Sequence, residues 1–341
     1  MKYLRVFESV SAYNTFADSE EYVEPNVSRI NEGGLVKYNK ARHDYSQDYL
    51  TFVFSTTGSI ELNHDSIYLS NDNGNTWTQE PLEVNAGDRR LAKGDMKKSY
   101  YDFCTSAFEL NGTFSVEGNV MSIYDSIGFR TRTSFDSSSH DLGYLFYEET
   151  GLTSAENLVL PATALTYGCY AYMFLGCTSL TTAPKILPAM TLADNCYNEM
   201  FYDCTSLTTA PELPATTLAS GCYYGMFEGC TSLTTAPELP ATTLADSCYH
   251  CMFSDCTELT TAPSILPATT LADNCYYCMF NGCTSLNYIK CLATDISASD
   301  CTSYWVSSVS STGTFVKNPN MSSWTTGDSG VPNGWTVQDA S

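Results

Sequence analysis

The chain has 341 residues, a formal net charge of −22 at pH 7, 43% hydrophobic residues and 15 cysteines. This length allows two or three domains, and the hydrophobic content is that of a folded protein with a sizeable core. The charge argues against nucleic-acid binding, because phosphates are held by clustered Lys and Arg. No apolar stretch predicts a membrane-spanning helix, and the opening residues lack the apolar segment of a secretory signal, so we expect no Sec-dependent export.

Residues 1–48 are predicted to form a small α+β module followed by a polar linker. Lys2–Phe7 alternates between apolar and polar residues like a strand, and a short helix is expected to end near Ala17. Glu32–Gly34 then marks a hairpin turn between two short strands.

This opening resembles a short N-terminal module of structural proteins from phages that infect gut Bacteroidetes. The resemblance rests on the Lys-Tyr-Leu-Arg-Val-Phe-Glu start, on Tyr13 and Phe16 in the expected helix, and on Val23–Ser28 before the hairpin. It implies a module for virion attachment or assembly, so that residues 1–48 would bind virion proteins.

Residues 49–141 are predicted to form a small antiparallel β domain that ends in a lead-in loop. Turn residues such as Thr57-Gly58 and Asn111-Gly112 separate short apolar runs with strand character. The predicted strands are Thr51–Phe54, Ser59–Leu62, Ser66–Leu69, Leu82–Val84 and Thr113–Val116.

Within this domain, Ser70–Trp77 matches the Asp-box pattern that recurs in sialidase propellers. The aspartate of this pattern accepts backbone N–H bonds, its glycine takes a positive φ, and its tryptophan packs beneath the turn. A single copy predicts a hairpin rather than a glycan-cleaving enzyme, which we keep only as a remote alternative.

Residues 142–310 carry a repeat of about 26 residues, Cys-Tyr-x-x-Met-Phe-x-x-Cys-Thr-Ser-Leu-Thr-Thr-Ala-Pro followed by Leu-Pro-Ala-Thr-Thr-Leu-Ala. A fixed period of this length predicts a solenoid, here mainly β with short helical turns. In each coil we expect a short strand around Ser-Leu-Thr-Thr-Ala and a helical or 3₁₀ turn around Cys-Tyr-x-x-Met-Phe. Residues 311–341 are predicted to form a β cap in which Trp324 and Trp335 cover the end of the core.

Ten cysteines follow the period of the repeat. Because equivalent residues of successive coils stack about 4.8 Å apart, they are predicted to form two columns of buried free thiols. Cys248-x-x-Cys251 and Cys275-x-x-Cys278 have the spacing of zinc half-sites. One cysteine of each pair belongs to a buried column, so we predict no bound metal and no cofactor. Pairing of Cys251 with Cys278, as a disulfide or through a metal, is left open. The ten are Cys169, Cys177, Cys196, Cys204, Cys222, Cys230, Cys248, Cys256, Cys275 and Cys283.

The positions at which the repeats differ are the candidates for ligand recognition. Tyrosine, methionine and phenylalanine never change in five repeats, which predicts buried ladders. The two residues between tyrosine and methionine vary and are expected to face solvent. The candidates there are Tyr172, Asn198, Glu199, Tyr224, His250 and Tyr277. A second candidate surface is a threonine ladder on the strand face, for which packing is favoured over sugar or protein binding. Its members are Thr181, Thr208, Thr234 and Thr260.

The repeat resembles the BspA-like leucine-rich repeat family over roughly residues 145–310. The resemblance lies in Cys-x-x-Leu-x-x-Ala, in the turn bearing Met-Phe, and in Leu-Pro at the end of the strand. It implies a surface protein that binds host proteins, glycans or neighbouring cells without catalytic residues. Alanine and proline replace a second large apolar strand residue of the family, which leaves the curvature of the sheet open.

No catalytic residues are predicted. Three of the four histidines precede an aspartate, and adjacent residues of a strand point to opposite faces. We therefore expect a non-enzymatic, virion-associated protein of fibre or decoration type, assembled in the host cytoplasm. Its solenoid would bind a host cell-surface protein or glycan. The alternative is a bacterial cell-surface adhesin of the BspA-like type. No nucleic-acid partner is expected, and a homo-oligomer is left open.

Overall fold

The computed structural model describes residues 43–96, 106–136 and 141–341. The strand, helix and hairpin predicted for residues 1–40 therefore lie outside the described residues. Ser46–Ser341 forms one compact unit. This unit is mainly β with several separate sheets and few helices, which confirms the mainly β class predicted from the sequence. The domain boundaries within it stay predictions.

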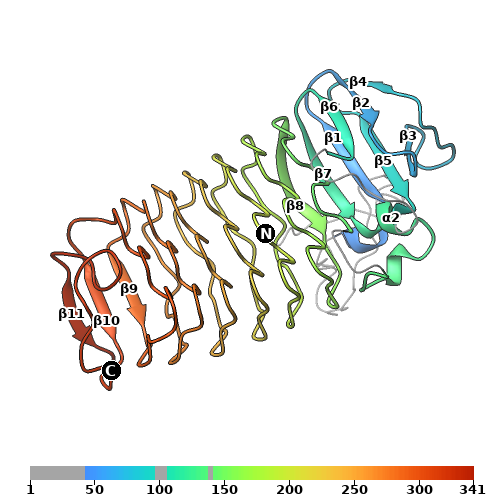
Figure 1. Ribbon diagram of the computed structural model, residues 1–341. Coiled ribbons are helices and arrows are strands. Elements are labelled where there is room, and N and C mark those ends of the chain that lie inside the picture. The colour runs from blue at the N-terminus through green and yellow to red at the C-terminus, as the bar shows by residue number, and fades with distance from the viewer. Residues whose placement is uncertain (1–42, 97–105, 137–140) are drawn as a thin grey trace, which may run out of the picture. The chain divides into compact units, whose positions relative to one another are not determined.

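A five-stranded sheet forms the centre of residues 50–159. Its strand order is β3-β5-β1-β7-β8, with antiparallel pairs except for the parallel pair of β7 and β8 (Figure 1). The strands are β1 (Leu50–Phe54), β3 (Ile67–Ser70), β5 (Arg89–Gly94), β7 (Phe114–Asn119) and β8 (Leu152–Val159). A smaller antiparallel sheet has the order β4-β2-β6, made by β4 (Leu82–Val84), β2 (Gly58–Leu62) and β6 (Phe108–Asn111).

The five strands predicted in residues 49–141 are present, whereas β5 and β6 were not predicted. The sequence of β5, Arg-Arg-Leu-Ala-Lys-Gly, has no β-branched or aromatic residue, and its strand character comes from hydrogen-bonded neighbours on both sides. The predicted lead-in loop contains the end of helix α2 (Met121–Tyr124) and the 3₁₀ helix η3 (Phe129–Thr131). A further 3₁₀ turn, η1, spans Tyr45–Gln47.

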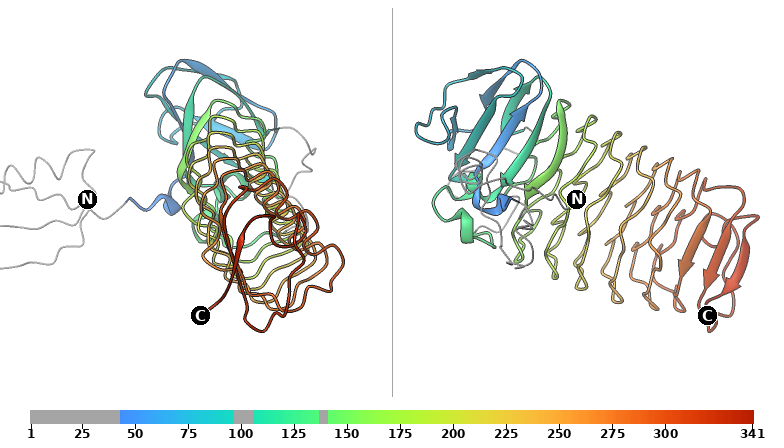
Figure 2. Two further views of the ribbon diagram at one scale, coloured as in Figure 1. Left: turned by 90° about the vertical axis from the view of Figure 1, so that its left-hand side faces the viewer. Right: turned by 180° about the vertical axis from the view of Figure 1, so that it is seen from behind.

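Strand β8 joins this sheet to the repeats. It pairs with β7 along one edge, and Ser154 on its other edge forms a parallel bridge with Thr182 of the first full repeat. Successive repeats then lie side by side, one behind another in the end-on view of Figure 2.

The segment around Cys-Tyr-x-x-Met-Phe is a series of turns rather than a helix, so the helical turn predicted for each repeat is wrong. Alternate amides donate to the next repeat, as from Tyr170 to the carbonyl of Cys196 at 3.0 Å and from Tyr172 to that of Asn198 at 2.9 Å. The amides between them bond three residues back, as from Ala171 to Gly168 at 3.0 Å. Half of the backbone donors therefore hold neighbouring repeats together.

A left-handed residue recurs every fourth position through these turns. In the first repeat Gly168, Tyr172 and Gly176 have φ of 60°, 61° and 73°. The equivalent residues of every later repeat share this conformation, which glycine, asparagine and aspartate adopt most easily. They are Asn195, Glu199 and Asp203; Gly221, Gly225 and Gly229; Ser247, Cys251 and Asp255; Asn274, Cys278 and Gly282; Asp300, Tyr304 and Ser308.

The strand expected around Ser-Leu-Thr-Thr-Ala is reduced to isolated parallel bridges, such as Thr182 with Thr209 and Thr235 with Thr261. The proline that ends each of these segments prevents a longer ladder. Regular strands return at the far end, where β9 (Tyr288–Cys291), β10 (Thr314–Lys317) and β11 (Thr336–Asp339) form a parallel sheet.

Identical side chains stack in columns through the core of the repeats. The tyrosine rings from Tyr170 to Tyr276 lie 5.8–6.1 Å apart between centroids, and the phenylalanine rings from Phe174 to Phe280 lie 5.2–5.7 Å apart. The ten cysteines of the two columns are all buried and free. Trp305 ends both ring columns and is itself covered by Trp324 at 5.7 Å, while Trp335 donates to the carbonyl of Ser310.

Within the described ranges, none of the helices has the length and apolar character needed to cross a membrane.

Candidate recognition surface

The six residues predicted to face solvent between tyrosine and methionine lie at the surface of the turns, but all are half-buried. The equivalent residue Ala171 is fully buried. Their partial burial follows from stacking against the neighbouring repeats. We call this region the turn surface and define it by Tyr144, Tyr172, Asn198, Glu199, Tyr224, Glu228, His250, Cys251, Tyr277, Cys278 and Tyr304.

Aromatic rings form two ladders on the turn surface. His250 lies between Tyr224 and Tyr277, with ring centroids 4.4 and 4.6 Å apart and rings inclined by 12° on both sides. Tyr304 extends this ladder at 6.2 Å from Tyr277 in an edge-on geometry and is 54% exposed. Tyr172 stacks on Tyr144 at 4.6 Å. The turn surface thus presents aromatic rings that neighbouring repeats hold in place.

His250 is held neutral by its position in the ladder. Burial lowers the pKa of His250 from its ordinary value of 6.5, because the charged ring would lose hydration. Its Nδ1 atom is buried and has no hydrogen-bond partner among the described residues. At neutral pH the centre of the ladder therefore carries no charge.

Carboxyl groups lie beside the aromatic rings. Burial, and then the neighbouring charges led by Glu199, raise the pKa of Glu228 to about 7, and burial also raises the pKa of Glu199. The two approach across Gly225, where a Cβ would lie 3.0 Å from Glu199 Cγ and 3.4 Å from Glu228 Oε2. A glycine between them therefore leaves room for both carboxyls, which suit cationic or hydroxyl-rich ligands.

Cys251 and Cys278 occupy equivalent left-handed positions in adjacent repeats. Both are free and half-buried, and burial raises the pKa of each thiol. No cluster of three or more His, Cys, Asp or Glu residues with metal-binding geometry occurs among residues 43–96, 106–136 and 141–341. The spacing that resembles a zinc half-site places Cys248 in the buried column and Cys251 on the turn surface.

The threonine ladder lies on another part of each repeat and is exposed. The hydroxyls of Thr181, Thr208 and Thr260 donate to main-chain carbonyls one repeat earlier at 2.9, 3.1 and 3.2 Å. These bonds join successive repeats, and the choice between a packing role and a binding role for the ladder stays a prediction. The ladder and the turn surface are separate candidates, since the two sets of residues are not brought together by any recorded contact.

Sequence reasoning missed Tyr144, Tyr304 and Glu228 as members of the turn surface. Tyr144 and Tyr304 belong to the degenerate repeats at the two ends, which lack the full motif. Their spacing was the signal: Tyr144 lies 28 residues before Tyr172, and Tyr304 lies 26 residues after Cys278. Residues about one repeat period apart occupy equivalent positions in neighbouring repeats. Glu228 follows the invariant phenylalanine, a position that also varies between repeats.

The chain matches no protein-family model, and no curated protein or solved structure matches it.

Proposed function

We propose that the chain is a non-enzymatic, virion-associated protein that binds a host cell-surface protein or glycan. Residues 142–310 act in this proposal as a solenoid of the BspA-like leucine-rich repeat type. Residues 1–48 bind virion proteins, as the resemblance of the N-terminal module implies.

The solenoid assignment is supported by contacts that recur at the repeat period. Amide-to-carbonyl bonds link each repeat to the next through the whole turn segment, and one ring column each of tyrosine and phenylalanine runs through all five full repeats. Stacked repeats that contact only their neighbours are the defining property of a solenoid.

The observation that carries the binding role is the aromatic ladder of the turn surface. The position that holds Tyr224, His250 and Tyr277 is alanine and asparagine in the first two full repeats, whereas the buried tyrosine and phenylalanine columns are invariant. Half-exposed aromatic side chains that are already ordered lose little entropy on binding and are enriched at interfaces.

Binding of the purified full-length protein to host cells tests the role of the turn surface. We expect the triple variant Tyr224→Ser, His250→Ser, Tyr277→Ser to lose cell binding, while Tyr288→Ser keeps it. Tyr288 is a suitable control because it is 42% exposed and lies on β9, outside the turn surface. Equal binding by the triple variant and the wild type, with both folded, would contradict the assignment.

Incorporation into particles tests the virion association. The deletion should stop before Ser46, because the carbonyl of Asp48 accepts a bond from the Asn119 amide and Ser46–Ser341 forms the compact unit. We expect a chain without residues 1–42 to fold and bind cells but to be absent from particles. Incorporation of this shortened chain would contradict the anchoring role, and display on bacterial cells in place of particles would favour the adhesin alternative.

A further inference from the structure

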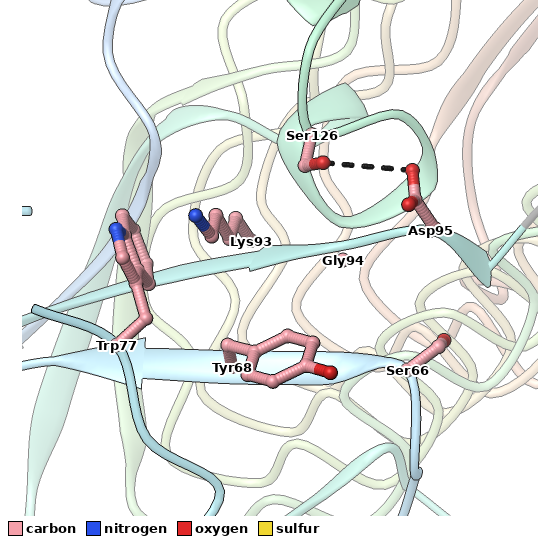
Figure 3. Close-up of a pocket in the computed structure, with 7 residues that line it drawn as sticks. All are labelled: Ser66, Tyr68, Trp77, Lys93, Gly94, Asp95 and Ser126. Atoms are coloured by element: carbon pink, nitrogen blue, oxygen red, sulfur yellow. Dashed lines mark hydrogen bonds between the residues drawn. The ribbon is translucent and has the colours of Figure 1, made fainter.

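A hollow lies on the five-stranded sheet, away from the repeats. It has a volume of about 310 Å³ and is lined by residues of β3 and β5, by the residue before β3 and the one after β5, by the hairpin after β3 and by the loop after α2 (Figure 3). This volume is at the lower end of the range for small-molecule sites. The lining residues are Ser66, Tyr68, Trp77, Lys93, Gly94, Asp95 and Ser126.

Strand pairing places two lining residues of the hollow, Tyr68 and Lys93, on the same face of the sheet. Tyr68 lies directly opposite Lys93 in the antiparallel pair of β3 and β5, so both side chains leave the same side of the sheet. The neighbours Ile67 and Leu69 point to the other side and are buried. Tyr68 is 40% exposed at the edge strand, which leaves part of its ring open to a ligand.

A rigid hairpin holds the tryptophan wall. Asp72 accepts bonds from the Ser70 hydroxyl at 2.7 Å and from the amide and hydroxyl of Thr76 at 2.9 and 2.7 Å. These bonds lower the pKa of the Asp72 carboxyl to about 2, so it stays ionised at neutral pH. The Trp77 indole donates to the carbonyl of Gly74 at 3.0 Å, which fixes the ring before any ligand arrives.

Polar groups face the aromatic side chains. The Lys93 ammonium lies 4.1 Å from the centroid of the Trp77 ring, and among the described residues no ion pair is recorded for it. Asp95 accepts from the Ser126 hydroxyl at 3.5 Å on the far side of the hollow, as Figure 3 shows. Among the lining residues that the structure describes there is one cation and one anion, although the chain as a whole has a net charge of −22.

We propose that this hollow binds a neutral saccharide. The Tyr68 ring and the edge of Trp77 pack against the apolar C–H face of a sugar ring. The Lys93 ammonium donates to hydroxyl or ring oxygens, and the Asp95 carboxylate accepts from hydroxyl groups. A balanced pair of charges in a strongly acidic protein suits a neutral ligand better than an anionic one. This inference goes beyond the proposed function and does not depend on it, because it concerns the sheet and not the turn surface.

Saturation-transfer NMR with the full-length protein tests the proposal directly. The probes are neutral oligosaccharides of glucose, galactose and mannose, with a uronic-acid oligosaccharide as the anionic comparison. We expect transfer to C–H protons of at least one neutral probe, and none to the anionic one. Tyr68→Ala and Lys93→Gln should each weaken binding by about tenfold or more, since each removes a packing surface or a charge-assisted hydrogen bond.

Tyr288→Ala is the matched control, because Tyr288 is exposed to a similar extent and lies on β9. It should bind the probe as the wild type does. The proposal is overturned if no neutral probe binds, if the anionic probe binds more tightly, or if folded Tyr68→Ala and Lys93→Gln proteins bind unchanged. Loss of cell binding by the turn-surface variant with sugar binding retained would separate the two proposals.

Discussion

The thiol of Cys230 donates a hydrogen bond of 3.1 Å to the main-chain carbonyl of Phe201, one repeat earlier. The same bond recurs along this cysteine column at 3.0–3.1 Å, from Cys177 to Phe146 through Cys283 to Phe253. The cysteines of this column therefore fill space and also bond a buried carbonyl, which an apolar side chain of similar size could not do.

Replacing Cys230 by alanine should lower the free energy of unfolding by about 1–2 kcal/mol, because packing and the thiol bond are both lost. Cys222→Ala is the control. Its thiol lies 3.9 Å from the carbonyl of Cys248, so mainly packing is lost there. Urea unfolding of the two variants measures the difference. Equal losses would show that the thiol bond contributes nothing.

Alkylation of the native protein should distinguish the turn-surface cysteines from the columns. Burial raises the pKa of the thiols in both sets, so the difference in reactivity comes from access of the reagent: the column cysteines are fully buried. With iodoacetamide at mildly alkaline pH, we expect Cys251 and Cys278 to be labelled before any column cysteine, because they are half-buried. Peptide mass spectrometry measures the order, and equally fast labelling of the columns would contradict the buried arrangement.

Glu149 should make the protein less stable as the pH rises. This carboxyl occupies the place that cysteine takes in later repeats and is 7% exposed, and burial raises its pKa from 4.5 to about 7. In the unfolded chain the carboxyl loses its proton near its ordinary pKa, so the folded state holds more protons between pH 4.5 and 7. The free energy of unfolding therefore falls through this window, by on the order of 3 kcal/mol in total.

The variant Glu149→Gln should be more stable than the wild type above pH 7 and about equally stable near pH 4. Thermal unfolding at a series of pH values measures this. Glu156→Gln, at an exposed carboxyl on β8, is the matched control and should leave the pH dependence unchanged. A wild type whose stability does not fall between pH 4.5 and 7 would contradict the burial of Glu149.

The stability of variants at the left-handed positions should depend on how readily the new residue adopts a positive φ. Ser247 has φ of 55° and is equivalent to Gly221 one repeat earlier. Ser247→Gly should be at least as stable as the wild type. Ser247→Val should lose about 2 kcal/mol, because β-branched residues are strongly disfavoured in this region. Melting temperatures provide the comparison, and a valine variant as stable as the glycine variant would exclude left-handed strain as a determinant.

The sequence was sufficient to predict the burial of the invariant residues, because side chains that stack on identical neighbours cannot vary independently. It was misleading for the turns. Cys169, Met173 and Cys177 are spaced by four residues, as on one face of a helix, and four-residue turns bury the same positions. The recurrence of Gly, Asn, Asp or Ser at the first and third left-handed positions of each repeat, eight residues apart, was the signal against a helix.

The candidate surfaces were predictable only in part. Variation between repeats pointed to Tyr224, His250 and Tyr277, but the stacking that half-buries them depends on which residues the neighbouring repeats present. The hollow beside Tyr68 could not be predicted, because its strand partner Lys93 lies on β5, which has little strand propensity of its own. Only the paired sheet brings these residues together.

The same amide-to-carbonyl bonds link every pair of neighbouring repeats, so one whole repeat can be added or removed without changing the pattern of these bonds. Removing residues 222–247 would join Gly221 to Cys248, and a left-handed glycine would again precede a column cysteine. The two 27-residue repeats carry their extra residue between the prolines, in Lys185-Ile186 and Ser264-Ile265. Recombination between near-identical repeats of the gene could therefore lengthen or shorten the protein. Each event would add, remove or exchange the turn-surface residues of one repeat and leave the buried columns unchanged.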